Sequence, residues 1–266
     1  MTRRFTVTDD QEKKVLEIYK RNKYIGQIAT KVGIDRHAVS QVLRDHPESG
    51  YDPRTSRRHK YFYDENFFTR IDTEAKAYYF GFFATDGWFK VENDNYLAWA
   101  ISIHEKDVDI LETLSKIMGP KSPDVIYRPN TNKVKLIFHS VKMCRDLRSK
   151  GLSNGKSYDL EDITMFVPRK LHHHFARGVF DGDGCWTDAR YRLRWSLRGT
   201  YNFLYSIKNI LPAETHIYGK VNDWKSLVTN KNDEAIRLGQ WIYKDANIFL
   251  DRKYKIYKSG YDRRRS

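Results

Sequence analysis

Residues 176–184 of the chain read ARGVFDGDG, an apolar, helix-like run that ends in an acidic turn punctuated by glycines. Residues 79–87 read YFGFFATDG and repeat the same frame, which is a glycine, four intervening residues and then Asp-Gly. A single Asp-Gly is weak evidence of a site, because glycine commonly caps a helix in the left-handed conformation and aspartate tolerates turns. The repetition, however, indicates that the chain contains two related halves.

Each stretch also carries two small residues four positions apart, which are Gly81 with Thr85 and Gly178 with Gly182. Positions i and i+4 share one face of a helix, and small residues on such faces let two helices cross with their backbones close together. We therefore expect both glycines of the motifs to lie in a helix interface that brings the carboxylates of Asp86 and Asp183 together. Carboxylates so placed suit Mg²⁺, and paired metal sites of this kind hydrolyse phosphodiesters.

Together the two stretches resemble the paired nonapeptide motifs of the LAGLIDADG homing endonucleases, and the resemblance covers roughly residues 61–258. It implies an α/β fold of tandem αββαββα repeats related by a pseudo-twofold axis, with a saddle-shaped antiparallel sheet. It also implies that Asp86 and Asp183, beside Thr85 and Gly182, hold Mg²⁺. The chain departs from the motif in three places: Ala84 and Thr85 replace an acidic and a small residue, and Arg177 stands where alanine is usual.

In this family a lysine late in each half supplies positive charge near the scissile phosphate, where it stabilises the charge that develops during cleavage. Lys156 and Lys253 resemble those lysines, and each follows its aspartate at the same distance along the chain. The resemblance therefore implies a catalytic set of Asp86, Asp183, Lys156 and Lys253.

The composition points to a nucleic-acid partner. The chain has 266 residues, a net charge of +14 and 14% aromatic residues, which favours an acidic polymer such as double-stranded DNA over a basic protein with no such ligand. Cys144 and Cys185 form no metal-ligand spacing and no disulfide framework, so we expect reduced thiols in the core. No apolar run reaches the ~20 residues of a membrane span, and no signal-peptide pattern is present. We expect an intracellular protein without a membrane partner, and the resemblance to the two-motif endonucleases implies a monomer.

Residues 1–45 predict a small all-α helix-turn-helix domain, with helices at 9–21, 25–32 and 36–44. Ala29 permits close packing and Gly33 permits the turn. The exposed face of the third helix has side chains that read base edges in a major groove, namely Arg36, His37, Ser40, Gln41 and Arg44. A three-helix module for protein contacts is the alternative.

Residues 46–60 read as a basic linker with little apolar periodicity. Arg57 and Arg58 within it are expected to follow the phosphate backbone of DNA and to make binding sensitive to salt. A solvated tether that contacts nothing is the alternative.

Residues 61–167 and 168–266 are predicted to form the two repeats. Asp72 is expected to cap the first motif helix and Pro168 to open the second, while the aromatic segment 61–71 is expected outside the core.

Two strands are predicted to carry basic side chains on their outer faces. Their alternating pattern points the following residues away from the core: Lys133, Lys135, Arg190, Arg192, Arg194 and Arg198. Four arginines on one face favour a sheet laid into the DNA groove over a solvated edge strand, because the guanidinium group fits guanine and phosphate.

The leading hypothesis is a site-specific endonuclease that cuts both strands of a long, asymmetric, pseudo-palindromic DNA site. The alternatives are an intron maturase of the same fold that binds RNA and a catalytically inactive DNA-binding regulator. Retention of Asp86 and Asp183 favours cleavage. The adjacent residues His172, His173 and His174 would point about 100° apart on a helix, so we expect structural or phosphate-contacting roles for them and no metal site.

Overall fold

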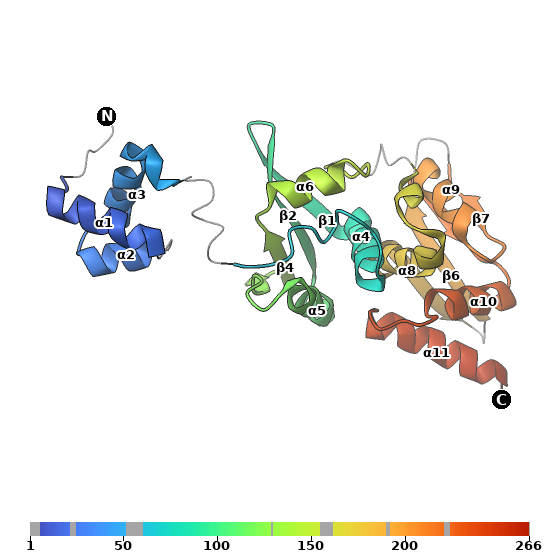
Figure 1. Ribbon diagram of the computed structural model, residues 1–266. Helices are drawn as coiled ribbons and strands as arrows, with labels where there is room; N and C mark the ends of the chain where they lie inside the picture. Colours follow the sequence, from blue (N-terminus) through green and yellow to red (C-terminus); the bar gives the residue numbers. More distant parts are fainter. Residues whose placement is uncertain are drawn as a thin grey trace. The chain divides into compact units, whose positions relative to one another are not determined.

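The computed structural model describes residues 6–21, 25–51, 61–128, 130–154, 162–189, 192–220 and 224–265 (Figure 1). The chain divides into two compact units, of which the first comprises residues 1–63 with 120–122 and the second comprises residues 64–119 with 123–266. Within the described ranges, no helix is long and apolar enough to cross a membrane.

Three short helices form the N-terminal unit around a core of their own. They are α1 (Asp9–Arg21), α2 (Ile25–Val32) and α3 (Arg36–Asp45), and a short 3₁₀ turn, η1 (Pro47–Ser49), follows them. Val15, Ile28 and Leu43 are fully buried among these helices. The turn from α2 to α3 passes through Gly33, whose φ of 72° is a conformation that other residues rarely adopt. Asp35 then starts α3 by accepting a hydrogen bond from the backbone N–H of His37 at 2.7 Å.

The larger unit is an α/β structure of two repeats with similar element order, as the sequence predicted. The first repeat contains α4 (Glu74–Asp86), β1 (Gly87–Glu92), β2 (Asn95–His104), η3 (Glu105–Asp107), α5 (Val108–Met118), β3 (Ile126–Arg128), β4 (Lys133–Phe138) and α6 (Val141–Arg148). The second contains η4 (Ile163–Phe166), η5 (Arg169–Leu171), α8 (His172–Asp183), β5 (Gly184–Ala189), β6 (Arg192–Gly199), α9 (Tyr201–Ile210), β7 (His216–Tyr218), β8 (Lys225–Val228), α10 (Asn232–Ile242) and α11 (Asp251–Arg265).

Each repeat builds one four-stranded antiparallel sheet, and the strand order is β1-β2-β4-β3 in the first and β5-β6-β8-β7 in the second. Both sheets bury one face against helices. A phenylalanine of each motif helix packs on a buried tryptophan of its own sheet: the ring centroids of Phe83 and Trp99 lie 5.7 Å apart, and those of Phe180 and Trp195 lie 5.5 Å apart. The Phe83 and Trp99 rings meet edge to face and the Phe180 and Trp195 rings are stacked, so each motif helix is fixed to its sheet by an aromatic contact of different geometry.

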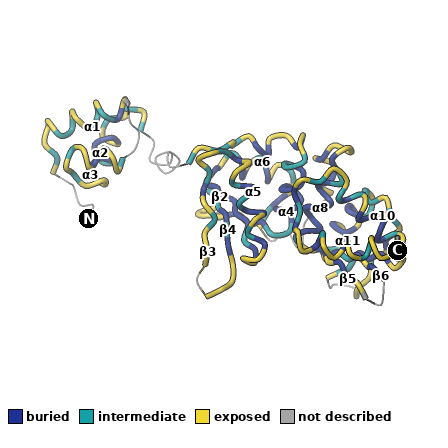
Figure 2. Tube along the Cα trace, turned by 90° about the horizontal axis from the view of Figure 1, so that it is seen from below, coloured by how far each residue is buried: buried dark blue, intermediate teal, exposed yellow. Residues whose placement is uncertain are grey.

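The motif helices α4 and α8 lie side by side at the centre of the larger unit, between the two sheets (Figures 1 and 2). Gly81 of α4 faces the carbonyl oxygen of Phe175, and Gly178 of α8 faces the carbonyl oxygen of Tyr78. A Cβ atom built at these glycines would lie only 2.3 Å and 2.0 Å from those oxygens. The two backbones can therefore approach this closely only because both positions lack a side chain.

The glycines that follow the motif helices do not act as left-handed caps. Gly87 has a φ of −82° and Gly184 a φ of −90°, so each strand starts directly from the helix end. A Cβ atom at Gly87 would lie 2.1 Å from the ring of Phe83, and one at Gly184 would lie 2.1 Å from the ring of Phe180. These positions require glycine because the chain turns over a core phenylalanine.

Two predicted helix starts were wrong. Thr73, and not Asp72, is the N-cap of α4, because its side chain accepts a hydrogen bond from the backbone N–H of Lys76 at 3.3 Å. Asp72 instead pairs with the ammonium group of Lys76 at 2.7 Å. Pro168 precedes the short turn η5, and α8 itself begins at His172.

Two other expectations about the core were also wrong. The segment 61–71 contributes Phe67, Phe68 and Ile71 to the core, since the Phe68 ring packs edge-on against Trp99 at 5.3 Å. Cys144 is buried as expected, but Cys185 is exposed on β5. The neighbouring Trp186 takes the inward position, so the alternation of the strand turns Cys185 outward.

Replacing Gly178 with alanine is expected to lower the free energy of unfolding by about 3 kcal/mol or more, because the new methyl group would overlap the α4 backbone. Urea denaturation followed by circular dichroism measures the change. Gly26→Ala is the matched control, since a Cβ atom at that position of α2 meets nothing within 4 Å. That control should be neutral or slightly stabilising. Equal stability of the two variants would contradict the close backbone contact.

Candidate active site and nucleic-acid interface

The C-terminal ends of α4 and α8 meet, and each end carries an aspartate. Asp86 is the last residue of α4 and Asp183 the last residue of α8. A Cβ atom at Gly182 would lie 2.7 Å from Oδ2 of Asp86 and 1.9 Å from Oγ1 of Thr85. The Asp86 carboxylate therefore lies against the α8 backbone directly beside Asp183. Asp86 is half-buried and Asp183 exposed, so the acidic pair reaches the surface.

The chemistry of this helix junction suits a hard divalent cation. Helix C-termini carry partial negative charge and carbonyl groups without intrahelical partners, and two carboxylates add oxygen ligands. Thr85 and Gly182, one residue before each aspartate, could contribute backbone carbonyls. Across the described part of the chain, no three or more His, Cys, Asp or Glu side chains cluster as metal ligands. A metal here would thus rely on two carboxylates, carbonyl oxygens and water, a set that fits Mg²⁺.

Lys253 lies beneath the α8 end, not on the surface. Its ammonium group donates hydrogen bonds to the carbonyls of Phe180 at 2.7 Å, Asp181 at 2.8 Å and Gly184 at 2.6 Å, with Gly182 at 3.5 Å. Only 3% of the residue is exposed, and this burial lowers its pKa to about 8. Its charge therefore offsets the negative end of the α8 dipole next to Asp183. Lys156, the expected counterpart, falls outside the described residues.

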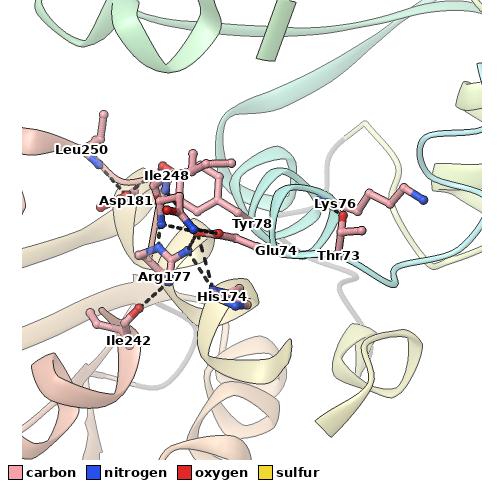
Figure 3. A network of polar contacts seen from close by, with 11 residues as sticks. Thr73, Glu74, Lys76, Tyr78, His174, Arg177, Asp181, Ile242, Ile248 and Leu250 are labelled. Carbon is pink, nitrogen blue, oxygen red and sulfur yellow. Dashed lines mark hydrogen bonds and ion pairs between the residues drawn. The ribbon is translucent and has the colours of Figure 1, made fainter. Parts of the chain in front are cut away.

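Arg177, the departure from the motif, is the centre of a buried polar network between the repeats (Figure 3). Its guanidinium donates to the carbonyls of Ile248 at 2.7 Å and Ile242 at 2.6 Å and to the Glu74 carboxylate at 2.6 Å. The side chain is fully buried, and this burial lowers its pKa. Burial opposes ionisation of Glu74 too, but hydrogen bonds from Asn247 and the charge of Arg177 leave the Glu74 pKa below its usual value.

Asp181 is a second buried acid in this network. Its Oδ2 atom accepts hydrogen bonds from the Tyr78 hydroxyl and from the backbone N–H of Leu250, both at 2.8 Å (Figure 3). Its other oxygen is buried without a hydrogen bond among the described residues, and burial raises the pKa of the carboxyl group. Asp181 therefore lies too deep for DNA or metal and instead joins both repeats to the start of α11.

The three consecutive histidines occupy the first turn of α8. The His172 ring contacts the carbonyl of Val167 at 3.0 Å, and the buried His174 ring contacts Arg177 at 3.0 Å. Burial lowers the pKa of His174 to about 4, so this ring is neutral at physiological pH. The His173 ring lies 6.0 Å from that of Trp241. These contacts are structural.

Both sheets carry basic side chains on the face away from their helices. On β6, Arg192, Arg194 and Arg198 are exposed, whereas Leu193, Trp195 and Leu197 between them are buried. On β4, Lys133 is exposed and Lys135 half-buried, both opposite the buried Val134 and Leu136. Arg190 lies outside the described residues. Gly184, the first residue of β5, pairs with Leu197 of β6, so the Arg198 end of β6 lies beside the end of α8.

In the N-terminal unit, the predicted DNA-reading residues lie along the side of α3 that faces away from the core. Arg36, His37 and Arg44 are exposed, and Ser40 and Gln41 are half-buried. The Gln41 amide is held between Asp45 at 2.8 Å and Arg44 at 3.1 Å. Arg57 and Arg58 lie outside the described residues.

Several site-forming residues were missed by the sequence reasoning. Glu74, Asp107 and Arg252 look like ordinary charged positions of amphipathic helices, and their partners are remote in the chain. The usable signals were two charged residues, Arg177 and Asp181, within the motif stretch, because a buried charge requires a partner.

The larger unit thus consists of two α–β repeats related by a pseudo-twofold axis. The repeats meet through the glycine faces of their motif helices, and each of these helices ends in an aspartate at the junction. This is the fold of the LAGLIDADG homing endonucleases. The meganuclease I-AabMI, solved bound to uncleaved DNA, matches with a TM-score of 0.50 at 13% identity, over 71% of this chain and 90% of its own. I-LtrWI, solved bound to its target DNA, matches with a TM-score of 0.50 at 11% identity, over 72% and 91%. No family model matches the sequence, and no curated protein does.

Arg177→Met is expected to lower the free energy of unfolding by about 3–5 kcal/mol, because Glu74 would stay buried without its cationic partner. Guanidinium-induced unfolding measures the loss. Arg237→Met provides the control, since Arg237 is largely exposed and its ion pair with Glu234 should contribute at most about 1 kcal/mol. If both variants lose the same small amount, the network does not stabilise the fold.

Proposed function

We propose that this chain is a site-specific DNA endonuclease that uses divalent metal ions to hydrolyse both strands of a duplex. The observation that carries the proposal is the meeting of two helix ends, each with one aspartate, at the centre of a two-repeat structure. Cutting two strands requires acid ligands for two scissile phosphates. One chain supplies both sets here, so it can act as a monomer.

The basic sheet faces support double-stranded DNA as the substrate. Arg192, Arg194 and Arg198 project together from β6, and the β4 lysines occupy the matching strand of the first sheet. Arginine binds guanine and phosphate through two parallel hydrogen bonds, which suits both base reading and backbone contact. The DNA complexes of I-AabMI and I-LtrWI support the same substrate.

Hydrolysis joins the oxygen of water to phosphorus and breaks the bond from phosphorus to the leaving oxygen. Asp86 and Asp183, with the carbonyls of Thr85 and Gly182, would hold Mg²⁺, which neutralises phosphate charge and makes bound water more acidic. The glycine contact keeps the two carboxylates at a fixed separation. Lys253 keeps the last turn of α8 in place and limits its negative charge, and the basic strands orient the duplex over the acids.

The N-terminal unit is proposed to be an accessory DNA-binding domain. Its third helix turns Arg36, His37 and Arg44 to the surface, and Gln41 is already oriented by two side chains. Arginine, glutamine and serine are the residue types that read base edges in a major groove. The linker, residues 46–60 with Arg57 and Arg58, would add phosphate contacts.

A pooled library of long duplexes, incubated with the protein and Mg²⁺ and then sequenced at the new ends, tests the function directly. The proposal requires cleavage at one defined asymmetric site, with loss of activity on chelation and recovery when Mg²⁺ is restored. Specific DNA binding without cleavage would indicate a regulator, and preferential binding of structured RNA would indicate a maturase.

Asp86→Asn and Asp183→Asn are each expected to slow double-strand cleavage by at least about a hundredfold, because each removes a carboxylate that would hold the metal ion, and with it the charge stabilisation that the metal would supply. Binding of the site in a gel-shift assay should change little, since the basic strands remain. Asp124→Asn, an exposed acid remote from both helix ends in sequence, is the control and should cut normally. Undiminished cutting by both helix-end variants would refute the catalytic assignment.

The double variant Arg36→Ala, Arg44→Ala is expected to bind its site more weakly and to discriminate less at the base pairs that α3 reads, at a cost of about 1–3 kcal/mol for each bidentate base contact that is lost. The footprint should also shorten on one flank, where α3 had occupied the groove. Lys14→Ala removes a cation from α1 of the same unit, where it pairs with Asp10, and is expected to leave the footprint unchanged. An unchanged footprint in the double variant would mean that this unit binds something other than DNA.

A further inference from the structure

The segment from Asn247 to Lys253 comprises the end of the connection between α10 and α11 and the first three residues of α11, and it is held by side chains of the first repeat although it belongs to the second. Glu74 of α4 accepts hydrogen bonds from the backbone N–H of Asn247 at 2.7 Å, from its side-chain amide at 2.8 Å and from the N–H of Ile248 at 3.2 Å. One carboxylate therefore fixes the first two residues of the segment.

The middle of the segment is fixed through Asp181. The backbone N–H of Leu250 and the Tyr78 hydroxyl donate to the same Asp181 oxygen, each at 2.8 Å. Tyr78 belongs to α4 and is fully buried, so its hydroxyl can adjust little. The backbone of Leu250 is thus linked to Tyr78 of the first repeat through the Asp181 carboxylate.

The end of the segment is fixed by Asp107 of η3. Both of its oxygens accept from the Arg252 guanidinium, at 2.8 Å from Nε and 3.0 Å from Nη2. The Asp107 side chain is nearly buried, and its hydrogen bonds raise the pKa of Arg252. Two parallel charge-assisted bonds of this kind fix direction as well as distance.

The next residue is Lys253, whose ammonium group lies on the α8 carbonyls around Asp183. All three attachments therefore act within seven residues of chain that end at this lysine. A displacement of the segment would withdraw the cation from the α8 end. Misplacements of about 1 Å at a site can cost about a hundredfold in rate.

We infer that Glu74, Tyr78 and Asp107 are positioning residues through which the first repeat holds Lys253 in place at the Asp183 end, so that loosening them slows cleavage of one DNA strand more than the other. The inference rests on the proposed endonuclease function. According to this inference, the position of Lys253 beside Asp183 depends on Glu74, Tyr78 and Asp107 of the first repeat, which act through the segment that carries Lys253.

The test uses the full chain and a duplex carrying its site, with a different label on each strand. Lys253→Met first shows which strand depends on Lys253. Asp107→Asn should slow the same strand by about tenfold or more and the other strand by less than about twofold, so that nicked duplex accumulates. Asp109→Asn, an exposed neighbour in the first turn of α5, is the matched control and should cut both strands at normal rates. Asp107→Glu keeps the carboxylate and should restore much of the strand balance.

A purely structural role for Asp107 would slow both strands together and in proportion to lost stability, which urea unfolding measures independently. Equal slowing of both strands, or of neither, would overturn the inference. Should Asp107→Asn fold poorly, Tyr78→Phe removes only one hydroxyl from the same set of attachments and must show the same strand preference. A wild-type protein that cuts no duplex would refute the proposed function instead, before any variant is compared.

Discussion

The contact between the backbones of α4 and α8 is the constraint on which the rest of the larger unit depends. Gly81 and Gly178 face carbonyl oxygens of the opposite helix at distances that no side chain would tolerate. Because the helices touch along this face, their C-terminal ends meet, and Gly182 lets the Asp86 carboxylate reach the α8 backbone. A helix pair held a few ångströms further apart would keep both aspartates but separate them.

The same close contact buries charged side chains, and the polar network around Arg177 offsets the free-energy cost of burying them. Tight packing buries Arg177, Glu74 and Asp181 along with the aromatic side chains, and a buried charge without a partner strongly destabilises a protein. Arg177 donates to two backbone carbonyls as well as to Glu74, so both charge and hydrogen-bonding capacity are largely satisfied. The net contribution of such a network to stability is small, whereas removal of one partner would leave an uncompensated buried charge.

Local patterns in the sequence were sufficient to predict the repeats and the basic strand, because hydrophobic alternation and helical spacing depend on near neighbours. The arginines of β6 project to one face as the period-two pattern requires, and the helices of the N-terminal unit occupy the residues that their apolar spacing predicted. The LAGLIDADG-like fold was predicted from the resemblance of the two motif stretches to the nonapeptides of that family.

Contacts between distant parts of the chain were not predictable in this way. Asp107 pairs with Arg252, and Lys253 binds carbonyls of α8, but nothing in the flanking residues of either indicates the partner. Lys253 could be placed late in the second half by its spacing, whereas its burial depends on how α11 packs. The N-cap of α4 was not predictable from the sequence either. Asp72 and Thr73 are both suitable cap residues, and the direction in which the chain enters the helix decides that Thr73 is the cap.

The helix contact joins two unlike surfaces, and this has a consequence for assembly. At equivalent motif positions, Phe80 of α4 corresponds to Arg177 of α8, and Leu171 corresponds to Glu74. If two copies of the second half paired with each other, each buried guanidinium would face a leucine instead of a carboxylate; two copies of the first half would leave Glu74 facing phenylalanine. Self-pairing would therefore remove the ion pair between Arg177 and Glu74, which disfavours it relative to the observed pairing of unlike halves. The two halves of the larger unit are consequently not interchangeable in the helix interface.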